Sequence, residues 1–290
     1  MKGIVSGMIH VLVSGYGVMT RGIIPHLARQ PGITVSLLSR HQTTPPCPGV
    51  ATVAPDNVST VSPDVIIGCF EDEERSHEFW TNPQLQRLIS ERHTSCIEMS
   101  TLSHGWAVKW HEVMASLGAT SVESPVTGSR VGAANGSLSA FVYQSAPDIA
   151  VDRVLDAFIS KRYEFHAPGN ATRFKLVYNA WGAAILHSLT AFVPTLESIL
   201  GDDFDVAADV VKNDGWMAPV CASKLDRMID QKYDDPDFAI KHMVKDLRYA
   251  RDVLGTSNEL LNMVSQAFVA AEKIHGGSAD YTAVTAAKAS

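Results

Sequence analysis

The N-terminal half of the chain alternates short apolar runs with segments of helical periodicity, which restricts it to few folds. The apolar runs of strand length are His10–Ser14, Ile33–Leu38, Asp64–Cys69, Ser95–Met99 and Ala119–Glu123. Between them lie the helical segments Met19–Arg29, Glu73–Trp80, Asn82–Ser90 and Ser103–Leu117. Such alternation favours a parallel, doubly wound sheet with helices on both faces.

The second half of the chain has a different character, because strand signals stop after about Ala167. We expect one long helix over Ala171–Leu200. Further helices are expected over Asp203–Asn213, Met217–Gln231, Ala239–Leu254 and Asn258–Lys273. The sequence therefore predicts an α/β protein, with a sheet domain over 1–167 and an all-helical domain for substrate binding and dimerisation over 168–290. The Thr-, Pro- and Gly-rich stretch His41–Ala54 is predicted to be a surface loop.

Composition excludes several classes of function. The net charge is −7 and no long basic run occurs, so a nucleic-acid partner is not expected. The four cysteines are far apart without a CxxC pair, and no histidines have metal-ligand spacing, which predicts free thiols in the cytoplasm and no metal site. The apolar stretch Asn179–Leu200 is interrupted by His187, Pro194 and Glu197, so we expect a buried or subunit-interface helix and no membrane span.

A glycine motif follows the first predicted strand and opens the first predicted helix. It comprises Gly15, Tyr16, Gly17, Val18 and Met19, with Thr20 where a GxGxxG motif has its third glycine. In such a turn the first glycine permits a tight bend, and the second lets the backbone approach a pyrophosphate. Two glycines alone also fit an ordinary strand–turn–helix corner. The surrounding strand–helix–strand unit favours a dinucleotide-binding Rossmann domain.

The end of the second predicted strand indicates which dinucleotide is bound. NAD sites usually place an acidic residue there to hold the ribose hydroxyls. This chain instead has Ser39 and Arg40. A guanidinium can bind a 2′-phosphate through two hydrogen bonds, and a serine hydroxyl can add a donor. We therefore expect NADP(H), with a solvated charge as the alternative interpretation of Arg40.

Several motifs resemble, in order along nearly the whole chain, those of the β-hydroxyacid dehydrogenase family. That family includes 3-hydroxyisobutyrate dehydrogenase, tartronate semialdehyde reductase and relatives, and it is related to imine reductases. The motifs are Gly15–Met19, Leu38–Arg40, Glu98–Ser103, Ser124–Leu138, Gly169–Asn179, Phe238–Asp246 and Gly277–Val284. The chain departs from the family at Thr20, and at Thr127 and Ser129, where the family has Ser-Gly-Gly. It also departs at Phe70 and Glu71 in the turn after the third strand.

The resemblance implies contacts for the cofactor and the substrate. Cofactor contacts would come from Cys69, Phe70, Glu71, Thr101, Phe238 and Lys245, in addition to the glycine motif, Ser39 and Arg40. Substrate contacts would come from Ser100, Thr127, Gly128, Ser129, Lys245 and Asp246. Small residues and hydroxyls around Gly128 suit a carboxylate, because backbone amides can approach it and the hydroxyls add donors.

Lys175 and Asn179 are four residues apart on the long predicted helix and therefore share a face. Hydride transfer to a carbonyl creates an alkoxide, which an ammonium can stabilise and protonate, and the reverse reaction needs the same group as base. The resemblance implies these catalytic roles for Lys175, with Asn179 donating to the substrate oxygen or orienting the lysine. A solvated surface lysine is the competing interpretation.

Together these features predict an NADPH-dependent oxidoreductase that interconverts a small hydroxy acid and its oxo or semialdehyde form. An NADPH-dependent imine reductase on the same fold is the first alternative. A non-catalytic NADPH-binding regulatory protein is the second. By family analogy we expect a cytoplasmic homodimer, with the apolar helix around Trp181–Phe192 at the subunit interface.

Overall fold

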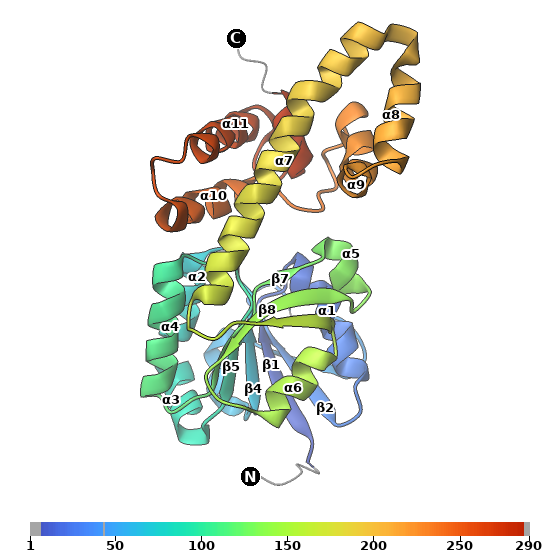
Figure 1. Cartoon of the computed structure of the whole chain (residues 1–290). Coiled ribbons are helices and arrows are strands. Elements are labelled where there is room, and N and C mark those ends of the chain that lie inside the picture. Colours follow the sequence, from blue (N-terminus) through green and yellow to red (C-terminus); the bar gives the residue numbers. More distant parts are fainter. Residues whose placement is uncertain (1–6, 43, 287–290) are drawn as a thin grey trace. The chain divides into compact units, whose positions relative to one another are not determined.

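The computed structural model of the protein describes residues 7–42 and 44–286. The chain folds into two compact units, Met1–Lys175 and Leu176–Ser290. The division falls inside a long helix, whereas the sequence placed the domain boundary between residues 167 and 168. The first unit contains the sheet and the second contains helices, as the change of character along the chain predicts (Figure 1).

The sheet unit has a parallel core in the strand order β3-β2-β1-β4-β5-β6. These strands are β1 (Ile9–Ser14), β2 (Ile33–Leu38), β3 (Val50–Val53), β4 (Val65–Gly68), β5 (Ser95–Glu98) and β6 (Ser121–Glu123). Beyond β6, β8 (Leu138–Gln144) runs antiparallel to β6 and to β7 (Val126–Thr127), and β9 (Ile159–Glu164) pairs parallel with β8. The sheet is therefore doubly wound with an antiparallel extension.

Helices cover both faces of this sheet (Figure 1). They are α1 (Val18–Arg29), η1 (Pro55–Thr60), α2 (Glu73–Trp80), α3 (Pro83–Arg92), α4 (His104–Ser116), α5 (Ser129–Ala134) and α6 (Ile149–Asp156). Side-chain caps start four of them, because Asp72, Asn82, Ser103 and Asp148 each accept a backbone N–H of the first turn.

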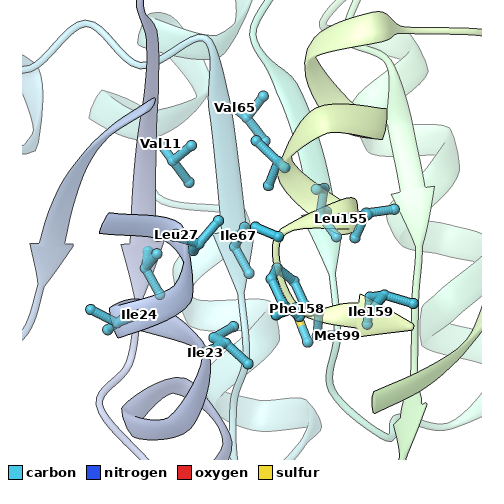
Figure 2. Packing of buried hydrophobic residues seen from close by; sticks show 14 of the residues in the cluster. Val11, Ile23, Ile24, Leu27, Val65, Ile67, Met99, Leu155, Phe158 and Ile159 are labelled. Carbon is cyan, nitrogen blue, oxygen red and sulfur yellow. The ribbon is translucent and has the colours of Figure 1, made fainter. Parts of the chain in front are cut away.

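Successive side chains along a strand point to opposite faces of the sheet and so belong to two separate hydrophobic cores. On β4, Val65 and Ile67 face the core under α1 and α6, whereas Ile66 faces the core under α2, α3 and α4. Figure 2 shows the first core, where Ile23 and Leu27 of α1 lie near Ile67. Burial on both faces explains why these strands are nearly continuous runs of apolar residues.

The second unit is all-helical in the part of the chain that the structure describes, apart from one isolated bridge between Ala239 and Asp280. Its elements are the remainder of α7 (Asn170–Leu200), η2 (Gly201–Asp203), α8 (Phe204–Asn213), α9 (Ala218–Ile229), α10 (Ile240–Leu254), α11 (Glu259–His275) and η3 (Tyr281–Ala286). Its main core packs α10 and α11 against Leu176, Ala180 and Ala183 of α7.

The prediction of a loop over His41–Ala54 is wrong at its end, because Val50–Val53 forms the edge strand β3. Only Val50 of this strand is buried, so no apolar alternation marks it. The edge strand β9 is equally hard to recognise, since Lys161 and Glu164 are exposed along it. Such strands are held by backbone pairing to a neighbour and not by a hydrophobic pattern.

Candidate active site

The turn after β1 has the geometry that a dinucleotide-binding loop requires. Gly15 has φ +89°, and a Cβ there would lie 2.8 Å from the carbonyl oxygen of Cys69. Any other residue would therefore be strained and would collide with the backbone. A Cβ at Gly17 would meet nothing within 4 Å, so space is open beside the start of α1. Gly17 also gives α1 no side-chain cap, which leaves its first N–H groups to other acceptors.

Thr20 occupies the position of the missing third glycine and is fully buried. Its hydroxyl donates to the carbonyl oxygen of Gly17 at 3.2 Å, so its polar atom is satisfied within the helix. The close approach of α1 to a neighbour occurs instead at Gly22, where a Cβ would lie 2.7 Å from the Cβ of Ala133 in α5. The small residue that permits tight packing is thus two positions further along.

The other residues of the glycine motif lie around this turn. Val18 is exposed and Met19 is half-buried against the core under α1. The Tyr16 ring lies under the guanidinium of Arg21, 4.9 Å from its centre. An exposed apolar residue at the first position of α1 is consistent with a surface that a ligand would cover.

The end of β2 carries the two residues predicted to select the cofactor. The Ser39 hydroxyl oxygen accepts the backbone N–H groups of Gln42 at 3.1 Å and His41 at 3.3 Å, so it shapes the turn. Arg40 is exposed and forms an ion pair with Glu78 of α2, with 2.8 Å between Nη2 and Oε1. Sequence reasoning did not identify Glu78, which is 38 residues from Arg40.

A buried carboxylate joins the ends of β4 and β5. Glu98 accepts the Ser100 N–H on Oε1 at 2.9 Å, and the Ser76 hydroxyl and Trp80 indole on Oε2 at 2.7 Å each. Burial raises the pKa of Glu98, although the hydrogen bonds from Ser100, Ser76 and Trp80 act in the opposite direction. The Ser100 hydroxyl oxygen in turn accepts the Phe70 N–H at 2.6 Å. This chain of bonds holds together the two loops predicted to flank the nicotinamide.

The remaining predicted residues of these loops lie nearby in the chain. Cys69 is half-buried, and its N–H donates to Ser14 of β1 at 3.4 Å. Glu71 is exposed and Thr101 is half-buried. These positions place the polar groups of the loops at the carboxyl ends of β1, β4 and β5, the edge where ligands bind in open α/β sheets.

The predicted carboxylate-binding segment forms the turn into α5. Gly128 has φ 127°, and a Cβ there would lie 3.1 Å from Leu138, so the backbone passes close to β8. Thr127 ends β7 and is half-buried, whereas Gly128 and Ser129 are exposed. Ser129 has φ 57°, in the left-handed region that favours glycine. The departure from Ser-Gly-Gly thus places a hydroxyl on a strained backbone.

Glu123, at the end of β6, binds the first turn of α7. Its carboxylate accepts the backbone N–H of Gly169 at 2.8 Å and that of Thr172 in a short hydrogen bond, and His111 Nε2 lies 3.2 Å from it. Burial alone would raise the pKa of Glu123, but hydrogen bonds from His111 and Thr172 lower it overall. The sequence did not single out this residue, because its partners are far away along the chain.

Helix α7 carries Lys175 and Asn179 one turn apart, and both side chains are buried, at 7% and 8% exposure. In the helical unit the Asn179 amide donates to Asp246 Oδ2 at 2.7 Å. Lys245 Nζ lies 3.2 Å from Asp246 Oδ1 and 5.5 Å from the Tyr249 ring centre. The fold therefore brings together three residues that the sequence named separately: Asn179, Lys245 and Asp246.

Phe238 precedes α10 in the same unit. Its half-buried ring packs against the rings of Tyr281 at 5.6 Å and His242 at 5.7 Å between centroids. Its N–H lies 3.5 Å from Asp280, a buried residue whose carboxylate also accepts the N–H of Asp237 at 2.8 Å. The motif Gly277–Val284, which contains Asp280 and Tyr281, thus holds the segment that leads into α10.

Residues 10–160, more than half of the chain, match the family model for the NAD binding domain of 6-phosphogluconate dehydrogenase. An L-threonate dehydrogenase from Escherichia coli is 28% identical over 198 residues, which cover 66% of this chain and 64% of that protein. Glyoxylate/succinic semialdehyde reductase 1 from Arabidopsis thaliana is 28% identical over 196 residues, which cover 65% of this chain and 66% of that protein. The aligned part thus spans just under two thirds of either relative.

Solved structures share the fold over nearly the whole chain. A 3-hydroxyisobutyrate dehydrogenase from Salmonella typhimurium has a TM-score of 0.76 at 20% identity, covering 96% of this chain and 99% of that one. An imine reductase from Myxococcus stipitatus in complex with NADP+ has a TM-score of 0.57 at 14% identity, covering 95% and 98%. The chain therefore belongs to the β-hydroxyacid dehydrogenase family of NAD(P)-binding dehydrogenases and reductases, which has the NAD-binding domain of 6-phosphogluconate dehydrogenase.

Proposed function

We propose that the protein is an NADPH-dependent oxidoreductase that interconverts a small hydroxy acid and its oxo or semialdehyde form, with Lys175 as general acid and base. The observation that carries this proposal is the burial of Lys175 on α7, one turn before an asparagine whose amide is held by Asp246. Lysine is among the residues least often buried in proteins, so a buried lysine calls for a chemical explanation.

Gly15, Tyr16, Gly17, Val18 and Met19 would hold the cofactor's pyrophosphate. The positive φ of Gly15, the open space at Gly17 and the uncapped start of α1 support this assignment, since backbone N–H groups at a helix start suit a phosphate. Ser39 and Arg40 would bind the 2′-phosphate of NADP(H). When bound, the cofactor supplies or accepts a hydride.

The loops after β4 and β5 would flank the nicotinamide through Cys69, Phe70, Glu71 and Thr101. Their mutual position depends on the hydrogen bonds from Phe70 to Ser100 and from Ser100 to Glu98. On the helical unit, Phe238 and Lys245 remain predicted cofactor contacts by family resemblance.

The substrate carboxylate would bind at Ser100, Thr127, Gly128 and Ser129. Ser100 lies where the loops after β4 and β5 meet, since its hydroxyl oxygen accepts the Phe70 N–H. The names of both curated relatives denote carboxylate substrates or products, namely threonate, glyoxylate and succinic semialdehyde. Lys245 and Asp246 complete the predicted substrate contacts, with Asp246 acting through Asn179 and Lys245.

Lys175 would donate and accept the proton that the reaction transfers. As a hydride reaches the carbonyl carbon, the oxygen gains negative charge, and the Lys175 ammonium donates a proton to it and becomes neutral. In oxidation the neutral amine removes the hydroxyl proton. An amide nitrogen carries two N–H groups, so Asn179 can hold Asp246 with one and donate to the substrate oxygen with the other.

An NADPH-dependent imine reductase is the second candidate, supported by the fold likeness to such an enzyme. Lys175 favours carbonyl chemistry, because an alkoxide needs a cationic proton donor beside it. A regulatory protein that binds NADPH without turnover is the third candidate, and the buried Lys175 and Asn179 argue against it.

The test measures NADPH oxidation with a panel of semialdehydes, keto acids and cyclic imines. We expect turnover of a carboxylate-bearing carbonyl, reduced at least about a hundredfold by Lys175→Ala and by the charge-conserving Lys175→Arg. The NADPH Kd of both variants should stay within about twofold. Turnover of imines alone, or a loss of NADPH binding by both variants, contradicts the proposal.

We also propose that the protein is a cytoplasmic homodimer joined along α7. Trp181, Phe192 and Ile199 of this helix are each more than two-thirds exposed in the single chain. The helical run Asn170–Asn213 has a mean hydropathy of 1.4 in its most apolar window, so length and composition alone would also allow a membrane span. A second copy of the chain accounts for the exposed apolar side chains without a membrane, because α7 also contributes Leu176, Ala180 and Ala183 to a protein core.

A further inference from the structure

Glu78 holds two arginines at the edge of the sheet where the cofactor is proposed to bind. Its Oε1 lies 2.8 Å from Nη2 of Arg40, and its Oε2 lies 2.8 Å from Nη1 of Arg75. Arg40 follows β2, whereas Arg75 and Glu78 lie on α2 after β4. All three residues belong to the sheet unit.

Stability does not explain this cluster. The side chains of Arg40, Arg75 and Glu78 are 57%, 57% and 51% exposed, and exposed ion pairs contribute little because water and salt screen them. Hydrogen bonds first from Arg40 and then from Arg75 lower the pKa of Glu78, so its carboxylate carries a full negative charge at neutral pH. The cluster is therefore a pair of accessible guanidinium groups around one anion.

The position of the cluster points to a ligand. β2 and β4 are the two neighbours of β1 in the sheet, and parallel strands end at the same edge. Gly15, at the end of β1, donates its N–H to Leu38 of β2 at 3.3 Å, and its backbone is packed against Cys69 after β4. A nucleotide on the glycine turn has the end of β2 on one side and the segment leading to α2 on the other.

A phosphate monoester is a better partner for two guanidinium groups than a carboxylate is. It carries nearly two negative charges and three acceptor oxygens, whereas Glu78 carries one charge and two oxygens. We propose that Arg75 is a second guanidinium for the 2′-phosphate of NADPH. Glu78 competes with this phosphate for Arg40 and Arg75, and it thereby limits the preference for NADPH over NADH that the two arginines provide. This inference rests on the proposed function of Arg40.

The competition makes an asymmetric prediction for the two cofactors. With NADPH bound, the Glu78 carboxylate loses its ion pairs with Arg40 and Arg75, and its negative charge repels the phosphate. NADH has no 2′-phosphate, so the ion pairs remain and Glu78 does not weaken the binding of NADH. Removing the charge of Glu78 should strengthen phosphate binding selectively, and removing Arg75 should weaken it selectively.

The experiment measures dissociation constants of the full-length protein for 2′,5′-ADP and 5′-AMP, and for NADPH and NADH, by calorimetry and fluorescence. Glu78→Gln is expected to tighten 2′,5′-ADP and NADPH by about fivefold at low salt, and by less at about 0.5 M NaCl. Arg75→Ala should weaken both by about tenfold, with 5′-AMP and NADH within about twofold. Glu91→Gln and Arg87→Ala are matched controls, because they break the exposed 2.7 Å ion pair of α3.

The outcomes separate this inference from the function on which it rests. If Arg40→Ala weakens NADPH selectively while Glu78→Gln and Arg75→Ala behave like the α3 controls, Arg40 keeps its role and the proposed competition is overturned. Equal losses of NADPH and NADH in Arg40→Ala overturn both. Tightening of 5′-AMP as much as 2′,5′-ADP in Glu78→Gln also overturns the inference, because it would show a general charge effect.

Discussion

At the scale of single residues, Ser129 adopts a backbone conformation that glycine adopts at lower cost. Its φ of 57° lies in the left-handed region. We expect Ser129→Gly to raise the free energy of unfolding by about 0.5 kcal/mol, because relief of the strain exceeds the added entropy of the unfolded chain. Urea denaturation followed by circular dichroism measures this change.

Ser137, in the exposed turn before β8, is the matched control, because its φ is not positive. Ser137→Gly gains only the entropy of the unfolded chain and should lower the free energy of unfolding by about 0.5 kcal/mol. Equal destabilisation by the two substitutions would show that the backbone at Ser129 carries no strain.

Asp246 is a buried partner of the candidate catalytic residue Asn179. The side chain is 1% exposed, and its two oxygens face Asn179 and Lys245. A buried carboxylate in this position fixes which way the Asn179 amide faces, since only the N–H side can face an anion. The spacing of Lys175 and Asn179 indicated a shared face, but not this partner.

At the scale of elements, the start of α7 depends on Glu123. This carboxylate accepts two backbone N–H groups of the first turn, from Gly169 and Thr172, and also contacts His111. We expect Glu123→Gln to lower the free energy of unfolding by about 2 kcal/mol at neutral pH, because a charged, buried helix cap is lost. Equilibrium unfolding in urea measures this loss.

The effect of Glu123 should also depend on pH. Because the folded-state pKa of Glu123 is lowered from 4.5, its contribution is present above that value and is lost as the pH falls through the lower folded pKa. The stability difference between the parent chain and Glu123→Gln should therefore shrink as the medium is acidified. A difference that stays constant down to strongly acidic pH would show that Glu123 does not titrate with folding.

At the scale of the whole molecule, the proposed dimer rests on the exposed apolar side chains of α7. We expect the chain, of 31.4 kDa, to elute at twice that mass in size-exclusion chromatography with light scattering. Substituting Trp181 and Phe192 together by serine should yield a monomer, because their exposed rings supply much of the apolar area that a second copy would cover.

Ile149→Ser in α6 is the control, because Ile149 is an exposed apolar residue of the sheet unit, at 52% exposure. This variant should keep the mass of the parent chain. A parent chain that elutes as a monomer, or one that requires detergent to remain in solution, would contradict the proposed soluble dimer.

Neighbouring residues were enough to predict the parallel half of the sheet, the helical second unit and the family. They also singled out Gly15, Arg40 and Lys175 as candidates, because hydrophobic periodicity, glycine turns and helical spacing are local properties of a chain. The folded structure was needed to find that β8 runs antiparallel to β6. It was also needed to find the edge strands β3 and β9, which backbone pairing stabilises. It was also needed to find the partners of the candidate site: Glu78 for Arg40, Glu123 for the start of α7, and Asp246 for Asn179. These contacts join residues 38, 46 and 67 positions apart, and a carboxylate in a sequence carries no mark of which distant group it will face once the chain is folded.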